Sequence, residues 1–362
     1  MDIKNQIKFH KLFVIVVAWQ LIAVTMSIYD HFTLVGATYS LGPSSTYSFG
    51  ISLGFHMLSS FMGAITGGSF LVFYVNERFR TKSYGYNLTL VCITYIVVYV
   101  IIVFISSAIF AVVMTGKPLT HPDTYQYYID ALFRPVMIRG IIIWAVIVAL
   151  TQLTLQLNDK FGPGILWAII KGKYHEPQEE TRIFMFLDLR SSTTIAEKLG
   201  NELYHNLLKD FYADITNSII YNKGEIYQYV GDEVVISWKM ENGLENHNCI
   251  KCFFDMRKTI TGLKQKYQSK YDLVPDFKAG LHYGKVIAGE IGIIKRDITY
   301  SGDVLNTTAR IQSECNKYNV DLLLSKDLVN SLQFGDNYET RSIGKILLRG
   351  KQKEVELETV IV

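Results

Sequence analysis

The sequence predicts an N-terminal domain of four membrane-spanning helices followed by a soluble α+β domain. Charged residues are unevenly distributed along the 362 residues: positions 1–157 contain 9 of the 36 lysines and arginines and 5 of the 33 acidic residues. Four long apolar runs lie in this first part, whereas apolar strands and amphipathic helices alternate in the rest. We therefore expect lipid around the first part and water around the second.

Each apolar run is long enough, or nearly so, to cross a hydrocarbon core, which takes about 20 residues. Lys4, Lys8 and Lys11 precede the first run, as in a cleaved signal peptide, but no small-residue cleavage site follows it, so a retained anchor is expected. The expected transmembrane domain is 1–157, with spans at about 12–28, 51–75, 88–114 and 136–155.

Positive charge flanks the spans on one side. The segment between the second and third spans contains Arg78, Arg80 and Lys82, whereas 29–50 contains no lysine or arginine. The positive-inside rule therefore places both termini in the cytoplasm.

Few residues within the spans carry a functional signal. His56 and Arg139 are the ionisable groups expected inside them, so a charged transport pathway is not predicted. Gly63, Gly67 and Gly68 predict a close helix contact, either within the bundle or between two subunits.

A linker, 158–181, joins the two domains. Its apolar segment 165–170, followed by Lys171 and Lys173, predicts a short helix at the membrane interface that ends before Pro177. It is either a simple spacer or a lever that passes changes in the membrane domain to the soluble domain.

The soluble domain, 182–362, alternates between strands and helices, and its sheet is expected to carry helices on one side. Turn residues predict one hairpin from the second and third strands and another from the fourth and fifth. The expected strands are 183–187, 225–230, 234–238, 277–282 and 286–291, with further short strands towards 360. The expected helices are 191–199, 201–222, 246–271 and 303–318.

Two aspartates stand where the chain is expected to turn. Asp188 ends the first strand of the soluble domain, and Asp232 lies at the tip of the first hairpin. If these strands are neighbours, the carboxylates converge, and two hard oxygen ligands suit Mg²⁺, which retains water and substrate phosphate in its shell. Backbone N–H groups at 191–193, where a helix begins, would add donors for phosphate. Each aspartate alone is equally typical of a helix cap or a turn.

Other polar residues are predicted to be structural. Cys249 and Cys252 have the spacing of a metal or redox pair, but they fall within one expected helix and no second pair accompanies them. His282 lies on an expected strand, where packing is the more ordinary role.

Four motifs occur in order: Phe-Leu-Asp-Leu-Arg-Ser-Ser-Thr at 186–193, Tyr-Val-Gly-Asp-Glu at 229–233, Gly-Leu-His-Tyr-Gly at 280–284, and Gly-Asp-Val-Leu-Asn-Thr-Thr-Ala-Arg at 302–310. Together they resemble the catalytic domain of class III adenylyl and guanylyl cyclases, of the membrane-anchored bacterial type. The resemblance implies a ferredoxin-like core sheet with helices, two Mg²⁺ or Mn²⁺ ions per site, and the bacterial inner membrane as the location.

The resemblance also implies roles for individual residues. Asp188 and Asp232 match the metal-binding aspartates, with the Leu189 carbonyl as a further ligand. Asn306 matches the residue that orients the ribose, and Arg310 the residue that stabilises charge on the α-phosphate.

The remaining substrate contacts are expected at two groups of positions. Ser191, Ser192, Thr193 and Lys351 would bind the phosphates. Gln228 and Thr299 match the pair that contacts the base; Thr299 resembles the bacterial adenylyl type, whereas an amide such as Gln228 can donate to or accept from either purine. ATP is favoured, with GTP as a side substrate.

In this family the metal-binding and Asn/Arg residues of one site belong to different subunits, which implies a homodimer. The sequence therefore predicts a membrane-bound adenylate cyclase that forms cyclic AMP and pyrophosphate by two-metal catalysis. The alternatives are a guanylate or dual-specificity cyclase, a catalytically silent nucleotide-binding receptor, and a transporter with a regulatory nucleotide domain. No basic stretch predicts a nucleic-acid partner.

Overall fold

The computed structural model describes residues 3–41, 48–75, 78–79, 83–132, 135–162, 165–294, 296–334 and 338–361. It divides into two compact units, Met1–Phe161 and Gly162–Val362. Each unit is described by itself.

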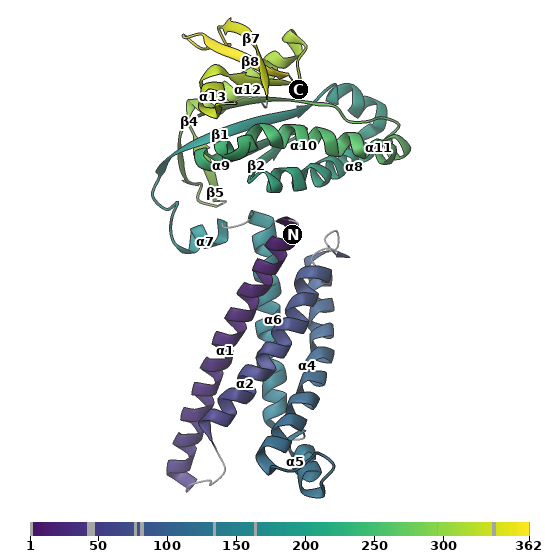
Figure 1. Cartoon of the computed structure of the whole chain (residues 1–362), viewed down its shortest axis with the longest axis vertical. Coiled ribbons are helices and arrows are strands. Elements are labelled where there is room, and N and C mark those ends of the chain that lie inside the picture. Colours follow the sequence, from purple (N-terminus) through teal and green to yellow (C-terminus); the bar gives the residue numbers. More distant parts are fainter. Residues whose placement is uncertain are drawn as a thin grey trace. The chain divides into compact units, whose positions relative to one another are not determined.

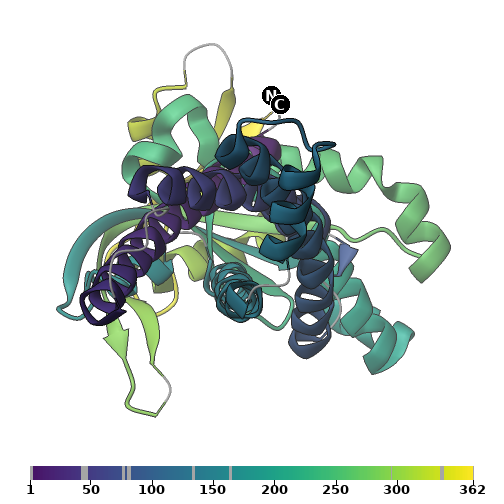
Figure 2. The same ribbon diagram turned by 90° about the horizontal axis from the view of Figure 1, so that it is seen from below.

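The N-terminal unit is a bundle of helices (Figures 1 and 2). Contacts join α1 to α2, α2 to α4, and α4 to α6. The bounds of its helices are α1 Ile3–Leu41, α2 Phe49–Gly63, α4 Tyr84–Thr115, α5 Pro122–Leu132 and α6 Pro135–Phe161. The π-helical segments Ala64–Gly68 and Phe70–Val75 continue α2.

Within the described part of the chain, four helical segments are long and apolar enough to cross a membrane, as the sequence predicted. They are Asn5–Thr33, Phe49–Val75, Gly85–Thr115 and Arg139–Lys160.

The loops between these segments contain more helix than expected. Residues 29–41, expected in a loop, continue α1, because no proline occurs before position 43 to interrupt it. The segment expected as a loop at 115–135 contains α5. Asp30 therefore lies within the first candidate span, where it accepts a hydrogen bond from Arg139 (Nη2 to Oδ2, 2.9 Å).

The glycines of the second span pack within the bundle. A Cβ atom built on Gly63 or Gly67 would lie 3.7 or 3.9 Å from the indole of Trp19 on α1. These glycines were predicted to make a close helix contact either within the bundle or between two subunits. The structure shows the contact within the bundle of one chain.

The C-terminal unit contains an eight-stranded sheet in the order β2-β3-β1-β4-β6-β8-β7, with β5 paired to β4 (Figure 1). The β4–β6 pair is parallel and the other pairs are antiparallel. The strands are β1 Gln178–Leu189, β2 Glu225–Val230, β3 Glu233–Lys239, β4 Phe277–Ile291, β5 Asp297–Ser301, β6 Leu322–Ser325, β7 Glu339–Ile346 and β8 Val355–Ile361.

Helices cover both faces of the sheet, so the prediction of helices on one side was wrong. On β1, Ile183 and Met185 point into a core shared with α8, α10, α11 and α13, whereas Phe184 packs on the opposite face with Val304 of α12. The helices are α7 Ile165–Ile170, α8 Ser192–Tyr221, α9 Met240–Leu244, α10 Asn248–Gly262, α11 Lys264–Tyr271, α12 Asp303–Tyr318 and α13 Lys326–Leu332.

Two helix boundaries follow local backbone breaks. Gly200 has positive φ (73°) and kinks α8, at the boundary predicted between two helices. The prediction of a single long helix at 246–271 was wrong. The backbone leaves helical geometry near Leu263, and this break separates α10 from α11.

The second predicted hairpin, 277–282 with 286–291, was also wrong. Both segments belong to β4, which pairs with β1 without interruption from Leu189↔Phe277 to Gln178↔Ala288. Gly284, interpreted as a turn residue, instead lets α12 approach, since a Cβ there would lie 3.2 Å from Val304. The hairpin partner of β4 is β5.

A buried arginine connects the strands at one edge of the sheet. The Arg182 side chain is 2% exposed and donates to Glu180 (2.8 Å), Glu225 (2.7 Å) and Ser237 (3.1 Å). Its guanidinium also lies 4.7 Å from the ring centre of Tyr300 on β5. These bonds satisfy a charge that would otherwise be costly to bury.

The close packing of α12 on β4 gives a stability prediction. A Cβ at Gly280 would collide with the backbone nitrogen of Gln312. We expect Gly280→Ala to destabilise the soluble unit by about 1–3 kcal/mol, because α12 must shift away from the sheet. Thermal unfolding of the full-length protein measures this. Gly262→Ala is the matched control, since a Cβ there meets open space, and an equal effect of both changes would contradict the packing argument.

Candidate active site

The two predicted metal-binding aspartates converge at one end of the sheet. Asp188 lies near the end of β1, opposite Glu233 of β3, and Asp232 lies in the tight turn between β2 and β3. Gly231 has positive φ (62°), which a two-residue hairpin turn requires. Burial raises the pKa of the Asp188 carboxyl, and the charge of Asp232 and a hydrogen bond with it raise that pKa further.

A third carboxylate, which the sequence analysis left within a motif without a role, adjoins this pair. Burial, followed by the charges of Asp188 and Asp232, raises the pKa of Glu233 from 4.5 to about 7. The three groups repel one another when all are ionised, so this corner of the sheet favours a bound positive charge.

Two further residues contact Asp188 and were not predicted. The Lys278 ammonium lies 3.4 Å from the Asp188 carboxylate, and the Gln312 amide donates a hydrogen bond to it (3.1 Å). Lys278 is directly opposite Asp188 in the β1–β4 pairing. Lys278 is only 7% exposed, which is unusual for a lysine, but no local sequence pattern marks it.

A tyrosine of α8 supports the hairpin. Tyr212 donates a hydrogen bond from its hydroxyl to the Gly231 carbonyl (3.0 Å), and its ring lies 4.6 Å from that of Tyr229 on β2. Burial and the nearby Asp232 charge raise the pKa of the Tyr212 hydroxyl, so it remains a neutral donor.

The predicted phosphate donors lie just beyond Asp188 in the chain. Leu189 ends β1, Ser191 has left-handed backbone geometry (φ 55°), and Ser192 and Thr193 begin α8. The first N–H groups of a helix lack intrahelical partners, and Ser191 makes no side-chain cap bond to them. These N–H groups remain available to an anion.

A second group of predicted residues lies on α12 and beside it. Asn306 and Arg310 are one helical turn apart; Asn306 is exposed and Arg310 is half-buried. Lys351 forms an ion pair with Asp303 in the first turn of α12, and a Cβ at Gly350 would lie 3.3 Å from the Arg310 guanidinium. The structure thus brings Lys351 to the same helix as Asn306 and Arg310.

The predicted base contacts lie on β2 and β5, two strands that tyrosines connect. The Tyr300 N–H donates to the Tyr227 hydroxyl (3.2 Å), and the two rings are 4.9 Å apart. Gln228 is exposed at a register shift next to Tyr227. Thr299 precedes Tyr300, and its buried hydroxyl has no hydrogen-bond partner within the described part of the chain.

The residues predicted to be structural are buried or half-buried. Cys249 and Cys252 are fully buried in the main core. The His282 imidazole is within hydrogen-bond distance of the Ser325 hydroxyl (2.7 Å), and burial lowers its pKa to about 4, so it packs as a neutral ring.

Known proteins are similar to the C-terminal unit. Residues 174–361 match the model of the adenylate and guanylate cyclase catalytic domain. Adenylate cyclase 2 of Rhizobium meliloti (strain 1021) is 32% identical over 201 residues, which cover 56% of this chain and 55% of that protein. A receptor-type guanylate cyclase of Caenorhabditis elegans is 28% identical over 188 residues, 50% of this chain and 18% of that protein.

A solved structure of a bacterial light-regulated adenylyl cyclase has a similar fold, with a TM-score of 0.53 and 24% identity, covering 60% of this chain and 64% of that one. The chain spans about half the length of the Rhizobium protein and less of the nematode one. The family match nevertheless extends over more than half of this chain and over every strand of its sheet. The chain therefore belongs to the class III adenylate and guanylate cyclase family.

Proposed function

We propose that the protein is a membrane-bound adenylate cyclase that converts ATP to 3′,5′-cyclic AMP and pyrophosphate. The observation that carries the proposal is the convergence of Asp188 and Asp232, together with the raised pKa of Asp188. Two neighbouring carboxylates ionise together more readily when a cation lies between them. A pair of ionised carboxylates is in turn a suitable ligand set for a divalent metal ion.

The donor set fits Mg²⁺ or Mn²⁺. No group of three or more His, Cys, Asp and Glu ligands is found among the described residues, but Mg²⁺ usually takes one or two carboxylates and completes its shell with water and substrate phosphate. Asp188, Asp232 and the Leu189 carbonyl would hold the ions. When bound, two such ions lower the pKa of the ribose 3′-hydroxyl and neutralise the triphosphate.

The residues of α12 would act on the ribose and the α-phosphate. Asn306 would hold the ribose so that its 3′-oxygen lies in line with the α-phosphorus. The Arg310 guanidinium would stabilise the charge that develops on the α-phosphate, since its rigid fork of donors matches phosphate oxygens. Lys351 and the N–H groups at 191–193 would bind the remaining phosphates.

Each site would be shared between two copies of the chain. Among the described residues, α12 reaches Asp188 through Gln312, whereas no hydrogen bond or ion pair joins Asn306 or Arg310 to either aspartate. A second copy could supply Asn306 and Arg310 to the aspartates of the first. The homodimer would then contain two composite sites.

The preference for ATP rests on Thr299 and on the relatives. The unpartnered Thr299 hydroxyl can accept a hydrogen bond from the amino group of adenine, and the Rhizobium relative is an adenylate cyclase. Gln228 can pair with either purine, and a guanylate cyclase is also among the relatives. Guanylate or dual-specificity activity is therefore the second candidate.

We also propose a location and a division of the chain. The four apolar helices would cross the bacterial inner membrane, with both termini in the cytoplasm. The domains would be 1–157 in the membrane, 158–181 as a linker and 182–362 as the catalytic domain. Trp167 and Ile169 of α7 are 60% and 40% exposed, which is consistent with an interfacial helix in the linker.

The first prediction concerns the substrate. The purified full-length protein in lipid, with Mn²⁺ or Mg²⁺, should form cyclic AMP from ATP at least about tenfold faster than cyclic GMP from GTP. A tenfold ratio of rates is about what one good hydrogen bond, made to adenine and not to guanine, would give. Product chromatography measures both rates. Faster cyclic GMP formation would overturn the assignment to ATP, and no product from either nucleotide would favour the silent receptor.

The second prediction tests the shared site. Asp232→Ala and Arg310→Ala should each lower activity by roughly a hundredfold or more, because each removes transition-state stabilisation. Co-expressing the two variants in one cell should restore about a quarter of wild-type activity, since half of the dimers are mixed and each has one intact site. Asp272→Asn, at an exposed carboxylate, is the control and should retain full activity. Failure of the mixed sample to recover would contradict shared sites.

The third prediction concerns pH and metal. An acid whose pKa rises on folding contributes stability below its unfolded pKa, and this contribution is lost as pH rises through the folded value. The pKa of Glu233 is 4.5 in an unfolded chain and about 7 in the folded protein. The metal-free protein should therefore lose thermal stability as the pH rises from 4.5 to about 7. Mn²⁺ should restore more stability above this range than below it. If Glu233→Gln showed the same pH slope, Glu233 would not be the titrating group.

A further inference from the structure

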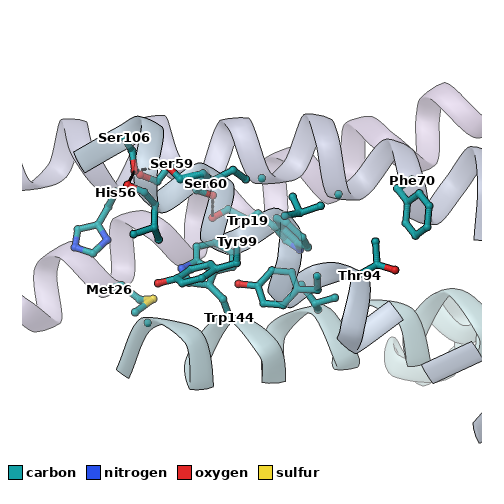
Figure 3. A pocket seen from close by; sticks show the side chains of 18 of the residues that line it. Trp19, Met26, His56, Ser59, Ser60, Phe70, Thr94, Tyr99, Ser106 and Trp144 are labelled. Atoms are coloured by element: carbon teal, nitrogen blue, oxygen red, sulfur yellow. Dashed lines mark hydrogen bonds between the residues drawn. The ribbon is translucent and has the colours of Figure 1, made fainter. Parts of the chain in front are cut away.

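The helical N-terminal unit contains a cavity that the proposed function does not use. It has a volume of about 100 Å³ and lies among α1, α2, α4 and α6 (Figure 3). Aromatic side chains form part of its wall: Trp19, Phe55, Phe70, Tyr95, Tyr99 and Trp144. An engineered apolar cavity of about 150 Å³ binds a benzene ring, so this smaller space admits at most one small ring.

Three polar atoms of the cavity wall are buried without a hydrogen-bond partner in the described part of the chain. They are the Ser59 hydroxyl, the Tyr95 hydroxyl and Nε of Arg139. Buried polar groups of native proteins nearly always have a partner. All three atoms carry a hydrogen that they can donate, and Nε of Arg139 can only donate, so an acceptor is the one kind of partner that would satisfy all three.

Charge at the polar end of the cavity is already balanced. His56, Ser59 and Ser106 lie together at one end, away from Phe70 (Figure 3). Arg139 is bonded there to Asp30 (2.9 Å), and Nε2 of His56 is 3.4 Å from the same carboxylate oxygen. Because Asp30 already neutralises Arg139, an anionic ligand would leave an unpaired negative charge here, and a neutral acceptor such as a carbonyl oxygen fits better.

The backbone keeps this space open. Gly63 and Gly67 line the cavity, and α2 continues there as a π-helix, a local irregularity that is frequent at functional sites. On the opposite wall, a Cβ at Gly140 would collide with the Tyr99 hydroxyl. The glycine at 140 therefore lets Tyr99 lie along the cavity wall.

We propose that this cavity binds a neutral carbonyl compound with one apolar ring. The ring would lie between the aromatic side chains, and its carbonyl oxygen would accept hydrogen bonds from Tyr95, Ser59 or Arg139. This site is separate from the residues of the proposed cyclase reaction and stands independently of that proposal.

The test uses the full-length protein in lipid nanodiscs and fluorine NMR of 4-fluoroacetophenone. The bound fraction is measured against empty nanodiscs, which correct for partition into lipid. Replacing the ketone oxygen by a CH₂ group, in 4-fluoro-α-methylstyrene, keeps the shape and removes the acceptor. We expect the ketone to bind about tenfold more tightly than this isostere, as one lost hydrogen bond implies.

Two variants locate the binding. Gly67→Leu should abolish it, because the leucine fills the cavity beside Trp19. Gly54→Leu is the matched control on the same helix, where a Cβ meets open space, and it should bind as the wild type does. Tyr95→Phe preserves the packing and should reduce the advantage of the ketone over its isostere.

Three outcomes would overturn the proposal. Equal binding by Gly67→Leu and Gly54→Leu would show that the probe is held by lipid or elsewhere. Equal affinity for the ketone and its isostere would show that no hydrogen bond forms. Tighter binding of 4-fluorobenzoate than of the ketone would show an anion site.

Discussion

The pairing register of β1 with its two neighbours is the constraint on which the soluble unit depends. β1 is buried on both faces, so a shift of one residue would exchange its two apolar sets and move Asp188 to the wrong side of the sheet. The same register sets Glu233 and Lys278 on either side of Asp188. A packing requirement in the core thus fixes the positions of charged groups at its edge.

The elements predicted well are those with a strong local signal. The apolar run of β1, the Gly231–Asp232 turn and the amphipathic pattern of α12 each determine their structure within a few neighbouring residues. The order of the motifs on these elements then identified four candidate site residues, Asp188, Asp232, Asn306 and Arg310. Their roles remain predictions.

The errors arose where distant packing decided the outcome. Glycine is typical of turns, so Gly284 was interpreted as a turn residue. In the structure a glycine is needed at this position because α12 packs against it. Lys278 and Gln312 reach Asp188 from strand and helix neighbours that no local pattern reveals. Asp30 was assigned to a loop because it follows the apolar run 12–28, and its partner Arg139 lies 109 positions away in the sequence.

The buried guanidinium of Arg182 has a consequence for how substrate choice can change. It joins β1 to Glu225 of β2 and lies against Tyr300 of β5, and these are the strands that carry Gln228 and Thr299. The spacing between the two predicted base-contact positions is therefore set from within the core. The purine selectivity of such a domain can therefore change through substitutions in its interior that do not contact the nucleotide. The residues around the base are then an incomplete guide to which nucleotide a homologue uses.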